Sequence, residues 1–203
     1  IFVVSRLVFD SIEDRFLNQL YEIGKISSEW MVREETRLLE TERLLANTTE
    51  IAEAIKSGDA ERLRILAYPI AVNSQVDAVE ILDMDGTSQL SMHHREGGRV
   101  EEYIFSRGET VLAEWDFVNK VLHAQQDDLG DKFGGMVQVA WGDFFYICGP
   151  IFDQDGNRVG AVLVGQSLLT LTRGMRESTL AQVTIYTFDG TPLVTTFLDA
   201  TPL

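Results

Sequence analysis

Cysteine, proline and basic residues are scarce in this chain of 203 residues. Cys148 is the only cysteine, so no disulfide can form within the chain, and a disulfide-stapled fold is excluded. Four prolines and no low-complexity tract leave no visible linker between domains. Lysine and arginine total 17 against 32 acidic residues, a formal net charge of −15. Such a charge repels phosphate backbones, and we therefore expect no nucleic-acid partner.

Long apolar runs are missing as well, because no stretch reaches the roughly 18 residues that a membrane-spanning helix requires. The chain nevertheless opens without methionine on an apolar segment, IFVVSRLVF at residues 1–9. Two interpretations of this segment remain open. It is either the outer end of a transmembrane helix, which would anchor the full-length protein in a membrane, or the start of an ordinary amphipathic helix.

Familiar catalytic and metal-binding patterns are absent from the sequence. It contains no glycine-rich phosphate loop, no nucleophile elbow and no HExxH motif. His93 and His94 are adjacent, so on a strand they point to opposite faces and cannot chelate one ion together. Cys148 has no evident activating partner, and we expect it to be a small buried hydrophobe. The sequence therefore predicts no metal, no cofactor and no enzymatic activity for this domain.

The first part of the chain carries helical periodicity. Apolar residues over 5–45 recur mostly at intervals of 3, 4 or 7, which predicts one helix on the order of 60 Å long. A helix of that length cannot bury its whole apolar stripe on a small core, so we expect it to protrude as a stalk or to pair with a second copy. Two short helices are predicted next, over 51–56 and from 60 to about 73, with Asp59 capping the second.

From Val76 onward the period changes to that of strands. Two helices interrupt this part, at 111–124 and 168–176, and residues 95–110 are polar and irregular. Asp-Gly pairs at 85–86, 155–156 and 189–190 predict tight hairpin turns. The pattern indicates an α+β fold built on an antiparallel sheet. The predicted strands cover residues 76–83, 87–93, 135–141, 144–152, 159–166, 181–188 and 191–197.

Three blocks of sequence resemble the Cache (PAS-like) family of bacterial sensor domains. DAVEILDMDG at 77–86 is similar to the first sheet strand and turn of such domains. FFYICGPIFD at 144–153, followed by GAVLVGQSL at 160–168, is similar to the central hairpin. VTIYTFDG at 183–190 is similar to the closing strand. The resemblance implies a stalk and dimerisation helix over residues 1–46 and a PAS-like sensor domain, with short helices beside its sheet, over residues 47–203.

The resemblance also implies a function. Cache domains are extracytoplasmic sensors of membrane-anchored receptors, and they pass ligand binding on to a histidine kinase, a nucleotide cyclase or a chemoreceptor output domain. We therefore expect a small-molecule ligand, a homodimer formed through the N-terminal helix, and a periplasmic or extracellular location. Two alternatives stay open: a structural or protein-interaction domain without a small ligand, and an enzyme of unknown chemistry on a PAS-like fold.

One departure from the family limits the choice of ligand. Amino-acid-binding members carry an aspartate at the end of the strand matched here by Val159–Gly165, where it binds the amino group of the ligand. This chain has Gly165 at that place, and it lacks the arginine and tryptophan that those members place ahead of the sheet. The sequence therefore argues against an α-amino acid as ligand.

Strand alternation supplies candidate pocket residues. Phe144, Tyr146 and Cys148 should share one face of their strand, and Gly165 on the next strand matches a ligand-facing family position. Because pockets and cores draw on similar apolar residues, an ordinary core position stays open for each candidate. The predicted ligand-binding residues are Trp115, Gln138, Phe144, Tyr146, Gly165 and, as a pH-sensitive or anion-contacting group, His94.

Overall fold

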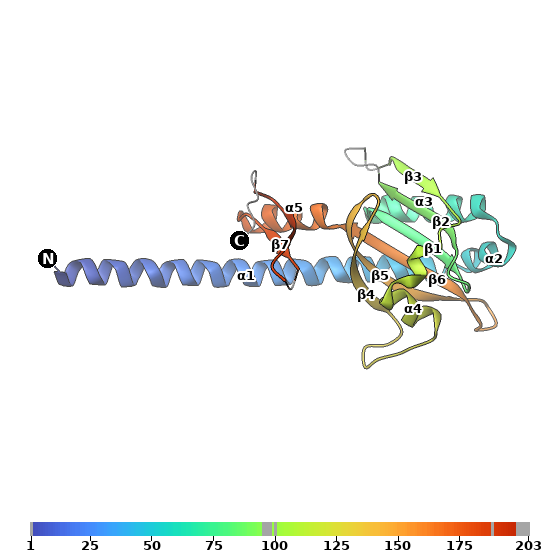
Figure 1. Cartoon of the computed structure of the whole chain (residues 1–203), viewed down its shortest axis with the longest axis horizontal. Helices are drawn as coiled ribbons and strands as arrows, with labels where there is room; N and C mark the ends of the chain where they lie inside the picture. Colours follow the sequence, from blue (N-terminus) through green and yellow to red (C-terminus); the bar gives the residue numbers. More distant parts are fainter. Residues whose placement is uncertain (1, 95–98, 100, 188, 198–203) are drawn as a thin grey trace. The chain divides into compact units, whose positions relative to one another are not determined.

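The computed structural model describes residues 2–94, 99, 101–187 and 189–197, with side chains described from residue 16 onward (Figure 1). The contacts form two compact units. One comprises Glu35–Leu168 and contains the large sheet, and the other comprises Ile1–Glu34 with Leu169–Leu203. The division into a stalk of residues 1–46 and a sensor of residues 47–203 remains a prediction.

The elements follow the expected order of helices first and strands afterwards, so the α+β class is confirmed. The helices are α1 (Phe2–Ala46), α2 (Thr49–Ser57), α3 (Ala60–Ser74), the 3-10 helix η1 (Val111–Glu114), α4 (Asp116–Leu122) and α5 (Leu168–Thr179). The strands are β1 (Ala78–Asp83), β2 (Ser88–His94), β3 (Tyr103–Ser106), β4 (Phe133–Val139), β5 (Gly142–Phe152), β6 (Arg158–Ser167), β7 (Thr184–Tyr186) and β8 (Pro192–Thr195).

Six strands form one antiparallel sheet in the order β3-β2-β1-β6-β5-β4. The apolar strand β6 lies between β1 and β5, and residues Val159–Gln166 are all buried. The strand predicted over 159–166 is thus a central one, covered on both faces. The hairpin turn between β5 and β6 contains Gly156 at φ 80°, a conformation that favours glycine.

Each face of the sheet carries its own apolar core. Helices α2 and α3 contact β1, β2 and β6, and Leu38 and Leu45 of α1 join the core on that face. Helix α4 contacts β4, β5 and β6 on the other face, where Leu112, Phe117 and Val121 form a second core with the sheet. Strand alternation sends Val79 and Ile81 to the first core and their neighbours to the second, so one strand serves both.

Polar contacts fix the ends of these helices. Asp59 caps α3 as expected, because its carboxylate accepts a hydrogen bond from the Arg62 N–H at 3.0 Å. Arg37 on α1 joins two further segments, since its guanidinium donates to the Gln75 carbonyl at 3.1 Å and to the Gln166 side chain at 3.2 Å. The C-terminal part of α1 is thereby bonded to the start of the sheet and to the end of β6.

Two expectations about the strands were wrong. The irregular segment 95–110 contains strand β3, which pairs with β2 at the edge of the sheet; residues 95–98 and 100 lie outside the described part. A strand of four residues with two exposed apolar side chains leaves little periodic signal. Strand β7 does not close the large sheet, because it pairs with β8 across the turn at Asp189-Gly190.

The helix predicted over 111–124 is divided at Trp115. This residue adopts an extended conformation, with φ −70° and ψ 131°, between η1 and α4. Its indole ring therefore stands at a corner of the chain, where it reaches the face of the sheet.

The other unit contains the N-terminal part of α1, helix α5 and the β7–β8 hairpin. Trp30 packs so closely on Gly174 of α5 that a Cβ at position 174 would overlap the indole. Within the described residues, no helix combines the length and apolar character needed to cross a bilayer.

Candidate functional site

A row of small residues crosses the face of the sheet that carries α4. The strand register aligns His93, Ala78, Gly165, Tyr146 and Gly135 on five neighbouring strands. Three of these five residues are alanine or glycine, so little side-chain bulk covers the backbone of the sheet there. Aromatic rings can therefore lie flat on the backbone.

Two rings occupy that space. The Tyr146 ring covers Gly165, where any Cβ would overlap its ring carbons, and the Phe117 ring of α4 covers Gly135 in the same way. Tyr146 is fully buried, yet its hydroxyl has no hydrogen-bond partner among the described residues. Burial raises the pKa of Tyr146 well above its usual value, the nearby charge of Glu80 adds to the shift, and the neighbouring Trp141 side chain opposes it.

The next row along the strands carries a buried carboxyl group. Glu80 on β1 stands between Ser91 on β2 and Leu163 on β6. Its side chain is fully buried, and neither carboxylate oxygen has a hydrogen-bond partner in the described part of the chain. Burial raises the pKa of Glu80 well above its usual value, the Ser91 hydroxyl opposes the shift, and the charge of Glu109 adds to it. Glu80 is therefore held as a neutral acid over a wider pH range than an exposed glutamate.

The β4–β5 turn adds an indole to the same face. The Trp141 ring stacks on His93 with a centroid distance of 4.2 Å and an interplanar angle of 5°. The Trp141 N–H and the His93 Nδ1 atom both lack partners among the residues described. Burial lowers the pKa of His93, with the charge of Glu109 opposing the shift, so its imidazole is favoured in the neutral form.

Aromatic rings surround the Tyr146 ring. Trp115 lies 5.7 Å from it and Phe144 lies 5.5 Å from it, measured between ring centroids. Trp115 also stacks on Phe117 at 5.7 Å. The polar atoms of Tyr146, Glu80 and His93 thus lie on a face whose other side chains are largely apolar and aromatic.

We name the five polar residues on this face the Glu80 cluster: Glu80, Ser91, His93, Trp141 and Tyr146. Each has at least one buried polar atom without a hydrogen-bond partner in the described structure. Leaving such an atom unpaired costs about 1–3 kcal/mol. Ser91 lies close enough to Glu80, and Trp141 close enough to Tyr146, to lower the pKa of each, but no pair within the cluster reaches good hydrogen-bond geometry. Such poorly paired atoms on one face can be completed by a ligand or by water.

The structure brings together four of the six predicted site residues. Trp115, Phe144, Tyr146 and Gly165 meet on the face of the Glu80 cluster. Gln138 is exposed, and its position in β4 alternates with Val137 and Val139, which pack on this face, so its side chain points away.

His94 also lies apart from the cluster. It alternates with His93 along β2, and its Nδ1 atom lies 3.2 Å from the Asp77 carboxylate. Its ring packs against Tyr103, which belongs to the core on the other face of the sheet. His94 therefore lies next to Asp77, on the opposite face of the sheet from the Glu80 cluster.

Four members of the cluster escaped the sequence analysis: Glu80, Ser91, His93 and Trp141. Glu80 could have been found from the sequence, because a carboxylate inside the apolar run Val79–Leu82 costs free energy when it is buried without a partner. Ser91 follows from Glu80 through the strand register. Trp141 lies in a turn, and no local pattern connects it with His93.

Among the described residues, no group of three or more histidine, cysteine, aspartate or glutamate side chains is arranged to hold a metal ion. The site therefore rests on hydrogen-bonding groups, one buried acid and aromatic faces.

Comparison with known protein families gives one match over most of the chain. The family model described as the double sensory domain of two-component sensor kinases matches residues 13–197. A comparison with curated protein sequences found no match.

Several solved structures share the fold. A sensory box/GGDEF family protein domain from Vibrio parahaemolyticus superimposes with a TM-score of 0.64 at 12% identity, covering 91% of this chain and 72% of that one. The E. coli DcuS sensor domain gives 0.54 at 17% identity, covering 72% and 98%. The ligand-binding domain of the Campylobacter jejuni chemoreceptor Tlp3, in complex with L-valine, gives 0.59 at 12% identity, covering 88% and 68%. At these identities the likeness concerns the fold.

Proposed function

The chain belongs to the family of double sensory domains of two-component sensor kinases, and we propose that it senses a small organic amine bound at the Glu80 cluster. The observation that carries this proposal is the fully buried Glu80 carboxyl group, whose two oxygens lack partners among the described residues. A protonated nitrogen is the natural partner for such a group, because an opposite charge offsets the cost of ionising a buried acid.

The surroundings of Glu80 favour a cation over an anion. The charges of Glu109 and Asp77 act on the same groups, and the cluster itself contains no lysine or arginine. Among the described residues, the charges of Glu109 and Asp77 would repel an anionic group placed there. The aromatic rings of Tyr146, Trp115 and Trp141 offer faces that attract organic cations. The same reasoning argues against an α-amino acid, whose carboxylate would find no cationic partner in the cluster.

Amine binding at Glu80 has a definite pH dependence. Without ligand the carboxyl group is protonated over a raised pH range, and pairing with an ammonium group requires that proton to leave. Binding therefore releases a proton at pH values below the raised pKa of Glu80. We expect the affinity for an amine to rise with pH through that range, provided that the amine itself stays protonated.

A thermal-shift screen against organic amines, organic acids and nucleobases tests the ligand class. A bound ligand raises the unfolding temperature through RT ln(1 + [L]/Kd), so weak binding registers when the ligand is in excess. We expect amines to give the largest shifts and Glu80→Gln to abolish them. Glu50→Gln is the matched control, because Glu50 is an exposed glutamate on α2. Equal shifts in both variants, or stabilisation by organic acids alone, would overturn the proposal.

We propose further that two copies of the chain pair through α1. Phe16, Leu17, Leu20 and Tyr21 follow one another at helical spacing, and all are exposed, Tyr21 to 72%. An apolar stripe of this kind on a helix is typical of a contact with a second helix. Sedimentation equilibrium should detect a dimer for the wild type and a monomer for Leu17→Asp, whereas the same association constant in both would contradict pairing through α1.

A role as a receptor's sensor domain also has consequences for where the domain lies in the cell. We propose that the full-length receptor is anchored in a membrane, presents this domain outside the cytoplasm, and carries its catalytic activity in a separate output domain. The family match and the periplasmic domains among its structural neighbours support this arrangement. Accessibility of a cysteine introduced at the exposed Leu129 to a membrane-impermeant thiol reagent in intact cells would test the location. Labelling only after lysis would contradict it.

A further inference from the structure

The edge of the large sheet is open where β4 begins. The last pair that β4 makes with β5 joins Phe133 to Cys148, whereas β5 continues to Phe152. Beyond that pair, no strand of the described part of the chain lies beside the outer edge of β5. Pro150 lies in this part of β5, and a proline suits an unpaired edge because it has no N–H group to satisfy.

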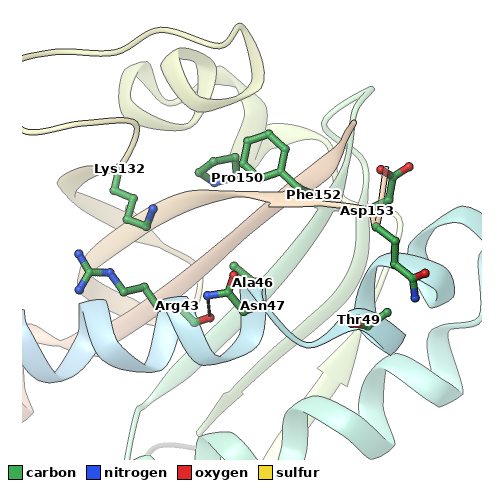
Figure 2. A pocket seen from close by; sticks show the side chains of 9 residues that line it. Arg43, Ala46, Asn47, Thr49, Lys132, Pro150, Phe152 and Asp153 are labelled. Carbon is green, nitrogen blue, oxygen red and sulfur yellow. Dashed lines mark hydrogen bonds between the residues drawn. The ribbon is translucent and has the colours of Figure 1, made fainter. Parts of the chain in front are cut away.

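A cavity of about 310 Å³ lies at this open edge (Figure 2). The end of α1 forms one wall with Arg43 and Asn47, and β5 forms the opposite wall with Pro150 and Phe152. Lys132, which directly precedes β4, closes one end. We name this cavity the edge pocket. It contains none of the residues of the Glu80 cluster, so it is a separate site.

The charges in the edge pocket are unevenly distributed. Figure 2 shows Arg43 and Lys132 at one end and Asp153 at the other. Asp153 is neutralised by an ion pair with Lys56, and that contact contributes to a pKa of Asp153 of about 2. Lys132 forms an ion pair with Asp131 at 2.9 Å. The guanidinium of Arg43 has no ion-pair partner among the described residues, although the chain as a whole carries a charge of −15.

A buried acid lies directly behind this basic end. Glu42 is fully buried on α1, and both its carboxylate oxygens lack hydrogen-bond partners within the described residues. It packs on Gly149 so closely that a Cβ there would overlap the carboxylate, and the same Cβ would lie 3.1 Å from Lys132 Cγ. The Glu42 carboxyl group and the stem of Lys132 therefore meet at Gly149, beside the edge pocket.

We propose that the edge pocket is a second binding site, for a small molecule bearing a carboxylate, phosphate or sulfate group held by Arg43 and Lys132. Arginine and lysine at one end of a cavity provide several charge-assisted donors for such a group. The Asn47 amide adds a neutral polar group, and the walls formed by Pro150 and Phe152 accommodate an apolar remainder. This site goes beyond the amine site and does not depend on it.

Glu42 makes anion binding in the edge pocket depend on pH. The groups that act on its carboxyl are Lys132 and Asp131 ahead of β4 and Arg43 on α1, and the buried Cys148 thiol on β5 is in turn influenced by Glu42. When Glu42 is ionised it attracts the same cations that would hold the bound anion. When Glu42 is protonated, Arg43 and Lys132 are left to the anion. Anion binding therefore tightens as the pH falls from 8 to 6, because burial raises the pKa of Glu42 to about 7.

Nuclear magnetic resonance titrations with sodium sulfate and with sodium acetate test the site, with sodium chloride keeping the ionic strength constant. We expect saturable shifts of the Asn47 and Gly149 amides, at least about tenfold weaker binding in Arg43→Ala, and weakened binding in Lys132→Gln. Arg107→Ala is the matched control, because Arg107 is an exposed arginine outside the pocket. Tighter binding of acetate assigns a carboxylate ligand, and tighter binding of sulfate assigns a phosphate or sulfate ligand.

The pH dependence is measured with sulfate, which stays dianionic from pH 8 to pH 6. We expect wild-type affinity to rise at least about fivefold from pH 8 to pH 6, and Glu42→Gln to bind equally well at both. The proposal is overturned if neither anion gives saturable shifts or if Arg43→Ala binds as well as Arg107→Ala. Glu80→Gln should bind sulfate as the wild type does, so failure of the amine site leaves this result unchanged.

Discussion

The ring of Tyr146 lies against Gly165 in the space that any side chain at position 165 would need. The two residues are direct partners across the β5–β6 pair, and both are buried. Gly165 therefore has a positive role in this chain. It gives room for the tyrosine to lie flat on the sheet, with its hydroxyl near Glu80 and Trp141.

Replacing Gly165 with alanine should destabilise the domain by about 1–3 kcal/mol, because the new methyl group would displace a fully buried ring. Urea unfolding measures the change. Gly24→Ala is the control: Gly24 lies in α1 with nothing within 4 Å of a new Cβ, so alanine there should stabilise by about 0.5–1 kcal/mol. The packing argument fails if Gly165→Ala unfolds at the same urea concentration as the wild type.

Two buried tyrosines give a matched comparison of hydroxyl groups. The Tyr103 hydroxyl donates to the Val76 carbonyl, whereas the Tyr146 hydroxyl has no partner in the described part of the protein. Tyr103→Phe should therefore lower the free energy of unfolding by about 1 kcal/mol. Tyr146→Phe should leave it unchanged or raise it. A loss of stability in Tyr146→Phe as large as that in Tyr103→Phe would show that the Tyr146 hydroxyl is satisfied inside the protein.

Glu42 should make stability depend on pH. Its folded pKa of about 7 exceeds its value of 4.5 in an unfolded chain, so its contribution to stability is full below pH 4.5 and is lost as the pH rises through 7. At about 1.4 kcal/mol per pKa unit, the loss amounts to about 3 kcal/mol. Glu42→Gln should therefore match the wild type near pH 4.5 and exceed its stability by up to that amount at pH 8.

Urea unfolding at the two pH values measures this difference. Glu50→Gln, at an exposed position, is the control and should follow the wild type at both. A difference between Glu42→Gln and the wild type that stays constant with pH would mean that Glu42 titrates as an exposed acid.

Tryptophan fluorescence should report amine binding directly. Trp115 packs on Tyr146 and Trp141 stacks on His93, whereas Trp30 lies in the other unit. Trp30→Phe should therefore keep the fluorescence change that an amine produces. Trp141→Phe should lose a large part of it. If Trp30→Phe removed the change while Trp141→Phe kept it, binding would take place away from the Glu80 cluster.

Much of the fold follows from local patterns. The Asp-Gly turns, the alternation of Phe144 and Tyr146 and the apolar run of β6 each reflect short-range chemistry, and each appears in the structure as predicted. Strand β3 was missed because a strand of four residues leaves little periodic signal. The β7–β8 hairpin was predicted from its Asp-Gly turn, but no local pattern shows that it forms a sheet of its own.

The site was harder to predict because it depends on which face of its strand each residue occupies and on how strands far apart in the sequence align. The pair His93-His94 must place one ring on each face, but only the register of β2 against β1 decides that His93 is the one on the face of Glu80. Gln138 points away because Gly135 pairs with Tyr146, which puts the odd-numbered residues of β4 on the site face. Trp141 reaches His93 through the fold of a turn, which no strand pattern describes.

Calorimetric titration of the best amine from the screen, into wild type and Glu80→Gln at pH 6 and pH 8, tests the central claim most directly. The account predicts tighter wild-type binding at pH 8, proton release on binding, and at least about tenfold weaker binding in Glu80→Gln at pH 8. Equal affinities for the two proteins, with no dependence on pH, would contradict the assignment of Glu80 as the group that receives the ligand.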